Sequence, residues 1–357
     1  MHSLEARIKE QAHALGFEMV GIAPATQADG FDRLAGWLQQ GFAGEMSYMH
    51  RHAEARRHPS SILAEVRSVI MVGMSYAPER TDGSTSAAAE DRSLQPRGRV
   101  ARYARGADYH DILRERLRQL LYALQEMVPE CRGRAVVDTA PLLERDFARR
   151  AGLGWFGKNT MLLNKRFGSY TLLGALLVDM ALEPDEAHAA SHCGSCTACL
   201  DACPTEAFVA PGRLDSRRCI AYLTIELRGQ VPAEFRPQVG DWIFGCDVCQ
   251  EVCPWNRKPP AGREPALVPA AGADSLDPLE IVLLSEEEFR RRFRSSAISR
   301  ATHSGLRRNA AIVLGNRGAA SALPALEQVV NDPDPVVAEA ARWAIERIEN
   351  RQFAFGK

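Results

Sequence analysis

Two kinds of apolar spacing alternate along the first half of the chain. Apolar residues recur at helical intervals in three stretches, residues 4–15, 31–40 and 109–127. Short apolar runs of strand length occupy residues 18–22, 69–74, 135–138 and 172–178. Residues 79–98 are rich in Gly, Ser, Ala and charged residues, which is typical of a surface loop. The pattern predicts an α/β domain over residues 1–182.

The pattern changes twice in the second half. Residues 183–192 mark a break in composition, and residues 193–254 contain eight of the nine cysteines with little regular spacing. We expect a ferredoxin-like, cysteine-rich module over residues 183–260. A linker rich in Pro, Gly and Ala, residues 259–273, then leads into a helical segment over residues 275–357.

This helical segment contains a weak internal repeat. Apolar stretches at residues 310–314 and 340–344 occupy equivalent places, 30 residues apart. Between them, the sequence Asn-Asp-Pro-Asp-Pro at residues 331–335 is typical of a turn that also starts a helix. Paired helices at this period indicate an all-α, HEAT-like C-terminal domain.

Composition and charge serve mainly to exclude certain partners and locations. With 44 basic and 45 acidic side chains among 357 residues, the net charge identifies no partner, so any nucleic-acid site must be a local basic patch. The N-terminus lacks the apolar core of a signal peptide, and no stretch has the roughly 18–20 apolar residues of a membrane span. We therefore expect a cytoplasmic protein without membrane contact, in which clustered cysteines indicate metal binding or catalysis.

Cysteine spacing is the most specific signal in the sequence. Four cysteines have the x2, x2, x3 spacing and the following proline of bacterial ferredoxins: Cys193, Cys196, Cys199 and Cys203. A second group, with one cysteine standing before it, has x2, x3 spacing and again a proline: Cys219, Cys246, Cys249 and Cys253. Eight thiolates are the number that two [4Fe-4S] clusters require, and the fourth cysteine of such a run ligates the other cluster. We assign one cluster to Cys193, Cys196, Cys199 and Cys253, and the other to Cys203, Cys219, Cys246 and Cys249.

Structural zinc and disulfides are the alternatives for these cysteines. Zinc sites usually contain two separated Cys-x2-Cys pairs, a pattern that this run does not follow. The ninth cysteine, Cys131, stands alone, and we assign it no role because a lone cysteine is usually a small buried hydrophobic residue. Since clusters carry only electrons, a substrate must bind elsewhere, and the α/β domain is the candidate.

Two features of the α/β domain point to a ligand. Asp138 ends a predicted strand, at the edge where α/β sheets bind ligands, so it is either a general acid or anchoring group, or the N-cap of a helix near Pro141. Four glycines between residues 152 and 168 flank Lys158 and Asn159, which indicates backbone packed against a large polar ligand. No P-loop and no Rossmann glycine motif is present, so neither kind of site is expected.

A basic stretch lies near the C-terminus. Seven arginines and no acidic residue occur between residues 290 and 308. Such clustering suits a phosphate backbone. The ordinary alternative is a solvated helix face, part of which the acidic residues 286–288 would neutralise.

These motifs together resemble one family, the epoxyqueuosine reductases. The similar segments are VDTAPLLER at residues 137–145, GWFGKNT at 154–160, RYARGADYH at 102–110, YLTIE at 222–226 and both cysteine groups. The similarity covers essentially the full length, including the HEAT-like end. It implies a base-off cobalamin in the α/β domain, next to the nearer cluster. The family reaction reduces the epoxide of epoxyqueuosine, at the wobble position of tRNA, to the alkene of queuosine with loss of water.

The resemblance also implies roles for individual residues. Electrons would pass from one cluster to the other and reduce the cobalt to Co(I), which then attacks the epoxide or transfers an electron to it. The family's proton donor corresponds to Asp138, and a raised pKa would suit that role. The candidate cobalamin contacts are Arg57, Tyr103, Asp138, Lys158, Asn159, Asn164 and Ser169. The candidate tRNA contacts are Arg228, Arg291, Arg292, Arg307 and Arg308.

The implied partners are a tRNA with a GUN anticodon (Tyr, His, Asn or Asp) carrying epoxyqueuosine, and a reductase, flavodoxin or ferredoxin as electron donor. We expect a monomer. One rival interpretation is a reductive dehalogenase acting on a small substrate, which would give the Arg-rich helical end no evident use. Another is a non-catalytic electron-transfer protein, which would leave the constellation from Asp138 to Ser169 unexplained.

Overall fold

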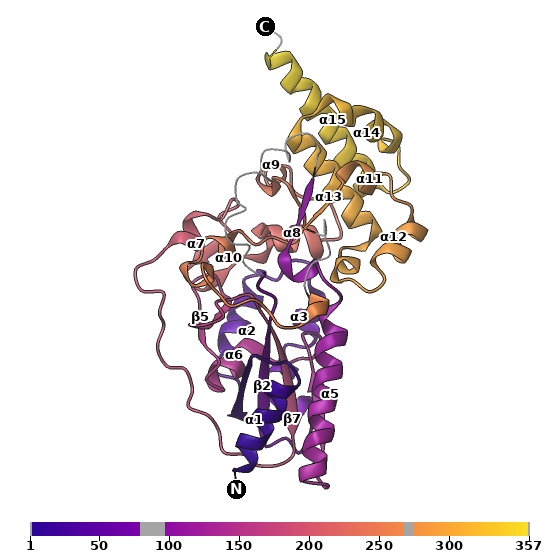
Figure 1. Ribbon diagram of the computed structural model, residues 1–357. Coiled ribbons are helices and arrows are strands. Elements are labelled where there is room, and N and C mark those ends of the chain that lie inside the picture. Colours follow the sequence, from indigo (N-terminus) through magenta and orange to yellow (C-terminus); the bar gives the residue numbers. More distant parts are fainter. Residues whose placement is uncertain (1, 79–96, 268–273, 356–357) are drawn as a thin grey trace.

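Residues 2–78, 97–267 and 274–355 of the chain are described by a computed structural model (Figure 1). Its first part contains a four-stranded sheet with the order β1 (Met19–Pro24), β2 (Ser68–Ser75), β7 (Thr171–Val178) and β4 (Gly133–Val136). All neighbouring strands are antiparallel. The expected α/β domain is therefore built on an antiparallel sheet, and the strand-end rule for parallel sheets, on which the expectation for Asp138 rested, does not apply.

The strand β2 is central to this domain, as its apolar sequence requires. All eight of its residues are buried, and successive side chains face opposite sides of the sheet. One side is covered by α1 (Leu4–Ala14) and α5 (Tyr109–Met127), and the other by α6 (Glu144–Arg150). Each side thus has its own hydrophobic layer.

The long helix α5 runs along the sheet (Figure 1) and shows how local sequence sets the fold. Asp108 caps its N-terminus by accepting the amide N–H of His110. The buried stripe that faces the sheet consists of leucines at helical spacing, Leu113, Leu117, Leu120 and Leu124. The helix ends at Met127, before Pro129, as predicted.

Shorter elements complete the first two parts of the chain. Around the sheet lie α2 (Phe31–Gln39), α3 (Ser47–Arg51) and the hairpin of β5 (Trp155–Phe156) and β6 (Leu162–Leu163). The cysteine-rich module contains α7 (Ala198–Asp201), β8 (Phe208–Ala210), β9 (Arg213–Leu214), α8 (Ile220–Ile225), α9 (Arg236–Val239), β10 (Trp242–Phe244) and α10 (Val248–Glu251). Elements this short, joined by loops, agree with the irregular sequence of the module.

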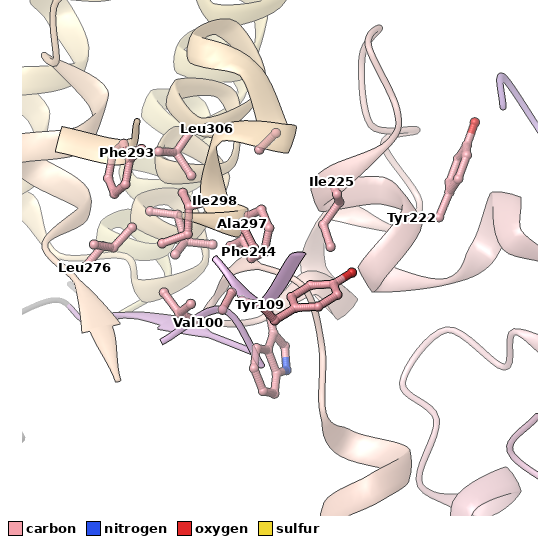
Figure 2. Packing of buried hydrophobic residues seen from close by; sticks show 14 of the residues in the cluster. Val100, Tyr109, Tyr222, Ile225, Phe244, Leu276, Phe293, Ala297, Ile298 and Leu306 are labelled. Carbon is pink, nitrogen blue, oxygen red and sulfur yellow. The ribbon is translucent and has the colours of Figure 1, made fainter. Parts of the chain in front are cut away.

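A three-stranded sheet joins the three predicted parts of the chain. The strand β10 of the cysteine-rich module pairs with β3 (Gly98–Val100) from the first part, and β3 pairs with β11 (Ser275–Leu276) from the last. Figure 2 shows the buried cluster around this sheet, to which Val100, Phe244 and Ile298 contribute. One hydrophobic core therefore extends through residues from all three predicted ranges.

After β11 the chain is helical. The helices are α11 (Pro278–Val282), α12 (Glu286–Phe293), α13 (Thr302–Arg317), α14 (Leu323–Val329) and α15 (Pro335–Phe355). The two predicted repeat segments lie in α13 and α15, which pack against each other. Gly315 permits this close approach, because a Cβ at that position would lie 2.9 Å from the Cα of Ala344.

The predicted helices and strands are confirmed to within two residues at their ends. The difference that matters concerns residues 135–138, because β4 ends at Val136 and leaves Asp138 in the following loop. Most of the predicted surface loop, residues 79–96, and residues 268–273 of the linker lie outside the described residues. Among the described residues, no helix has the length and apolar character needed to cross a membrane.

Arg308 on α13 is a buried structural residue. Only 1% of its surface is exposed, and its guanidinium donates to the carbonyl oxygens of Leu223, Leu227 and Gly229. The prediction that Arg308 contacts tRNA is wrong, because its side chain is enclosed between the helical part and the cysteine-rich module. Its charge instead satisfies backbone carbonyls that would otherwise be unpaired.

Replacing Arg308 with methionine should lower the free energy of unfolding by about 3 kcal/mol, because three buried carbonyls lose a charged donor. Denaturant unfolding of the anaerobically purified protein measures this change. Arg290→Met is the matched control, since Arg290 is exposed and pairs with Glu286 on its own helix. The control should change stability by less than about 0.5 kcal/mol. Equal stability of the two variants would contradict the structural role of Arg308.

Candidate functional site

Four of the predicted cluster ligands line one cavity. This cavity has a volume of about 250 Å³, and the thiols around it are Cys193, Cys196, Cys199 and Cys253. Other side chains at its wall include Lys158, Asn159, His192 and Trp255. Cys196 is exposed and Cys253 is buried, so the cavity extends from the surface inwards.

The donor set of this cavity suits a four-iron cluster better than a single ion. Within the described residues, no three His, Cys, Asp or Glu side chains are close enough to hold one metal ion. In a four-iron cubane each thiolate binds its own iron, so the sulfur atoms lie further apart than the four ligands of a zinc ion. Four thiols around one cavity are also the number of ligands that the predicted four-iron cluster requires.

The other four predicted ligands gather beside the first group. Burial, together with the charges of Cys219 and Cys203, raises the pKa of Cys246 to about 12. Burial and the surrounding thiols also raise the pKa of Cys249 well above its ordinary value. Thiols crowded in this way ionise together when a metal cluster balances their charge, so this group fits a second cluster. The ninth cysteine, Cys131, is buried in the hydrophobic core.

Three predicted cofactor contacts connect the α/β domain to the cysteine-rich module. Lys158 Nζ donates to two carbonyl oxygens of the first cysteine loop, at 2.7 and 2.9 Å. Asn159 Nδ2 donates to the carbonyl oxygen of Cys249 at 3.2 Å. Ser169 Oγ donates to Gln250 Oε1 at 2.9 Å. These side chains fix the cysteine loops against the domain that precedes them.

Arg57 and Asn164 make contacts of another kind. Arg57 lies 3.9 Å from the ring centroid of Phe31 and pairs with Glu54 at 2.5 Å. Asn164 Nδ2 donates to the carbonyl oxygen of Leu153, and the residue lines a second cavity of about 540 Å³. In this structure both residues support the folding of the α/β domain.

Asp138 lies where the α/β domain meets the helical part. Its Oδ2 is 3.2 Å from Nε2 of His110 on α5 and 2.7 Å from the guanidinium of Arg300 in the helical part. Nδ1 of His110 lies 2.7 Å from Oδ1 of Asp108, the N-cap of α5. On the other side, the amide N–H of Asp138 donates to Glu144 Oε1 at 2.7 Å. The result is a chain of carboxylate, imidazole, carboxylate and guanidinium groups.

The structure excludes one of the two roles considered for Asp138. The helix α6 begins at Glu144, and its N-cap position is occupied by Leu143, so the N-cap interpretation of Asp138 is wrong. Its backbone has a φ of 51°, in the left-handed region. Its side chain is 41% exposed, which leaves the carboxylate accessible to a substrate.

The charges around Asp138 differ from the sequence expectation. Burial alone would raise the pKa of Asp138, but hydrogen bonds from His110 and Arg300 outweigh it and lower the pKa well below its ordinary value. The prediction of a raised pKa is therefore wrong for the free protein. Burial would lower the pKa of His110, but hydrogen bonds with Asp108 and Asp138 raise it to about 9. At neutral pH the proton of the pair thus resides on His110.

Sequence reasoning gave no role to His110 or Arg300. His110 ends the segment of residues 102–110, and Arg300 is one of the seven clustered arginines. They lie 28 and 162 positions from Asp138 in the sequence, so no local pattern connects them. Arg56, the neighbour of the predicted cofactor contact Arg57, was also missed, and its guanidinium interacts with the charge of Asp138.

Known proteins match this chain over its whole length. A family model described as a 4Fe-4S double cluster binding domain matches residues 192–256, one described as epoxyqueuosine reductase QueG matches residues 56–139, and one described as HEAT repeats matches residues 292–354. An epoxyqueuosine reductase from Pseudomonas aeruginosa is 43% identical over 96% of this chain and 94% of its own length. The chain belongs to the epoxyqueuosine reductase family.

Solved structures of epoxyqueuosine reductases have the same fold. One, determined with an epoxyqueuosine-modified stem loop of tyrosine tRNA, has a TM-score of 0.88 and 34% identity, covering 98% of this chain and 92% of its own. Another, from Bacillus subtilis with a catalytic aspartate loop swung out of the active site, has a TM-score of 0.87 and 33% identity, covering 97% and 90%. Family membership makes this chain an oxidoreductase, and the matches confirm its two-cluster module and HEAT-like end.

The remaining arginines predicted to contact tRNA have different environments in this epoxyqueuosine reductase fold. Arg307 is only 11% exposed and pairs with Asp332 at 2.6 Å, so it stabilises the helical part. Arg291 is 75% exposed and pairs with Glu288 on its own helix, as the acidic residues 286–288 led us to expect. Arg292 and Arg228 are also exposed. Of the five predicted tRNA contacts, these three arginines are exposed to solvent.

Single cysteine replacements should divide into the same two groups of four predicted cluster ligands. Cys193→Ala and Cys253→Ala should each lower the iron content from about eight to about four per chain and remove the same electron paramagnetic resonance signal. Cys219→Ala should remove the other signal, because its thiol lies among the second group. Cys131→Ala is the control and should retain both. A Cys253→Ala protein that lost the signal lost in Cys219→Ala would refute this assignment.

The stability of the protein should fall as the pH rises from about 6.5 to about 9. The pKa of His110 is raised from 6.5 to about 9 by Asp108 and Asp138, so the folded protein holds a proton that the unfolded chain releases earlier. This stabilisation is complete below about pH 6.5 and is lost as the pH passes about 9. Denaturant unfolding across this range should show the decline, and His110→Gln should flatten it. His50→Gln, at an exposed histidine, should leave the slope unchanged.

Proposed function

We propose that this protein reduces epoxyqueuosine at the wobble position of tRNA to queuosine. The observation that carries the proposal is the accessible carboxylate of Asp138, held between His110 and Arg300 in a chain that also gathers two groups of four thiols. The family match and the relative solved with a modified tRNA stem loop support the same substrate. The wobble base lies in a single-stranded loop, so it can enter a pocket without melting a duplex.

The same proposal places a large redox cofactor between Asp138 and the second group of thiols. Burial raises the pKa of Tyr103, whose hydroxyl interacts with the charges of Asp138 and of Asp247, the neighbour of a predicted cluster ligand. Arg102 Nε is buried and has no hydrogen-bond partner among the described residues. An aromatic ring and a free donor in this place suit cobalamin, which would supply a low-potential cobalt centre able to break the epoxide bonds. The resident clusters would deliver the electrons.

The protein's own groups can supply one of the two protons that the reaction needs. Converting an epoxide to an alkene and water consumes two electrons and two protons, and the departing oxygen must be protonated. Asp138 is ionised in the free protein, but His110 Nε2 lies 3.2 Å from its carboxylate and carries a proton at neutral pH. Asp138 can therefore pass a proton from His110 to the oxygen, while Asp108 keeps the imidazole oriented. The second proton comes from solvent.

The cellular setting follows from this substrate. A tRNA-modifying enzyme works in the cytoplasm, where a reductase, a flavodoxin or a ferredoxin would reduce the outer cluster. We further propose that Arg228, Arg291 and Arg292 contact the tRNA backbone, and that the enzyme acts as a monomer. The relative with a displaced catalytic aspartate loop suggests that the loop carrying Asp138 also moves during the cycle.

Anaerobic reconstitution with iron, sulfide and cobalamin tests the proposed function. The reconstituted protein is incubated with a chemical reductant and epoxyqueuosine-containing tRNA, and nucleosides are analysed by mass spectrometry. Queuosine that forms only when cobalamin is present supports the proposal. Bound cobalamin and iron without product would instead favour a dehalogenase-like enzyme, and iron without bound cobalamin would favour an electron carrier.

Replacing Asp138 with asparagine should reduce turnover by at least about 10²-fold, because an amide cannot pass on the proton of His110. Iron content and cobalamin binding should remain those of the wild type. Asp111→Asn is the matched control, since the side chain of Asp111 is 78% exposed. Full activity of Asp138→Asn, measured as queuosine formed under single-turnover conditions, would exclude Asp138 from proton transfer.

A further inference from the structure

The backbone at Asp138 is strained. A φ of 51° is unusual for a residue with a Cβ, and the N–H of Thr139 donates to the carbonyl oxygen of Val137 across it. A hydrogen bond between residues two apart, with a positive φ at the central residue, belongs to the rarer and strained form of the γ-turn. Such a conformation costs of order 1–3 kcal/mol and persists only where surrounding contacts hold it.

Glu144 provides such a contact from the neighbouring helix. Its Oε1 accepts the amide N–H of Asp138 at 2.7 Å, six positions away in the sequence. Glu144 is the first residue of α6, and this helix is anchored by Phe147 and Ala148, both fully buried against the sheet. The helix α6 cannot shift without disturbing the core. The hydrogen bond from the Asp138 amide to Glu144 therefore holds the turn at a fixed position relative to this helix.

We propose that Glu144 is a positioning residue of the reductase site, which holds the strained turn so that the carboxylate of Asp138 stays between His110 and Arg300. The proposal rests on the proposed function of Asp138 as proton donor. Without Glu144 the amide of Asp138 loses its acceptor, and the turn can relax to an ordinary backbone conformation. The carboxylate would then move away from the proton on His110.

The ionisation of Glu144 agrees with this role. Burial and the negative charge of Asp138 raise the pKa of Glu144 to about 8, so the acid is mainly protonated at neutral pH. The other charged or titratable groups that face it are Arg145, His110 and Tyr109. A protonated carboxyl still accepts the N–H through its carbonyl oxygen, and it adds no second negative charge beside Asp138.

A purely structural role for Glu144 is the competing explanation. The first residue of a helix often has an acidic side chain that stabilises the helix N-terminus. That role would require the charge and would affect stability, whereas the positioning role requires only an acceptor oxygen. The amide of glutamine keeps the oxygen and removes the charge, so Glu144→Gln separates the two explanations.

The experiment compares Glu144→Ala, Glu144→Gln and a control, Glu130→Ala, at an exposed glutamate beyond the end of α5. Each protein is reconstituted with clusters and cobalamin, and kcat and KM are measured with epoxyqueuosine-containing tRNA. We expect Glu144→Ala to lower kcat by about 10²-fold with little change in KM, as a displaced catalytic group would. Glu144→Gln and Glu130→Ala should stay within about threefold of the wild type. All variants should keep their iron content and midpoint of thermal unfolding.

Hydrogen exchange gives a readout that does not depend on activity. In the wild type the amide of Asp138 is bonded to Glu144, so a peptide covering residues 137–143 should exchange faster in Glu144→Ala and normally in Glu144→Gln. Unchanged kcat in Glu144→Ala, or equal losses in both Glu144 variants, would overturn the positioning role. Failure of the wild type to form queuosine would instead overturn the proposed function, and full activity of Asp138→Asn would overturn the role of Asp138.

Discussion

The site depends on holding one ionised carboxylate between two cations from distant parts of the chain. Asp138 pairs with His110 on α5 and with Arg300 in the segment before α13. Removing a carboxylate and a guanidinium from water is unfavourable unless both are well paired, so this arrangement forms only after the sheet and the helical part have come together. The site is a product of the complete fold, and no single predicted domain contains it.

The helical part therefore has a structural role, which is separate from any contact with RNA. Arg308 and Asn309 of α13 donate to backbone carbonyls of the cysteine-rich module, among them those of Thr224 and Ile243. These bonds fix the start of α13, and with it Arg300, which lies two residues before the helix. The enclosed side of the helical part thus builds the site, whereas Arg291 and Arg292 on α12 are exposed.

This division explains what the sequence could and could not predict. The cluster ligands could be predicted from local spacing, because two-residue spacers bring thiolates to one cubane whatever the rest of the chain does. Helices such as α5 follow from caps and apolar periodicity. The environment of Asp138 could not be predicted, since its partners are far away in sequence and reverse the pKa shift that burial alone would give. Arg307 and Arg308 looked like surface charges because a run of arginines does not reveal which guanidinium groups are enclosed.

In the proposed reaction, electrons and protons reach the same place by separate routes. The first thiol group reaches the surface through the exposed Cys196, whereas Cys249 of the second group is surrounded by other thiols and further from solvent. A protein donor can therefore approach the first group, and the second is suited to pass electrons inwards towards Tyr103. The proton comes through His110 on α5, whose Nε2 lies 3.2 Å from Oδ2 of Asp138. In this scheme the carboxylate of Asp138 is the point at which the two routes join.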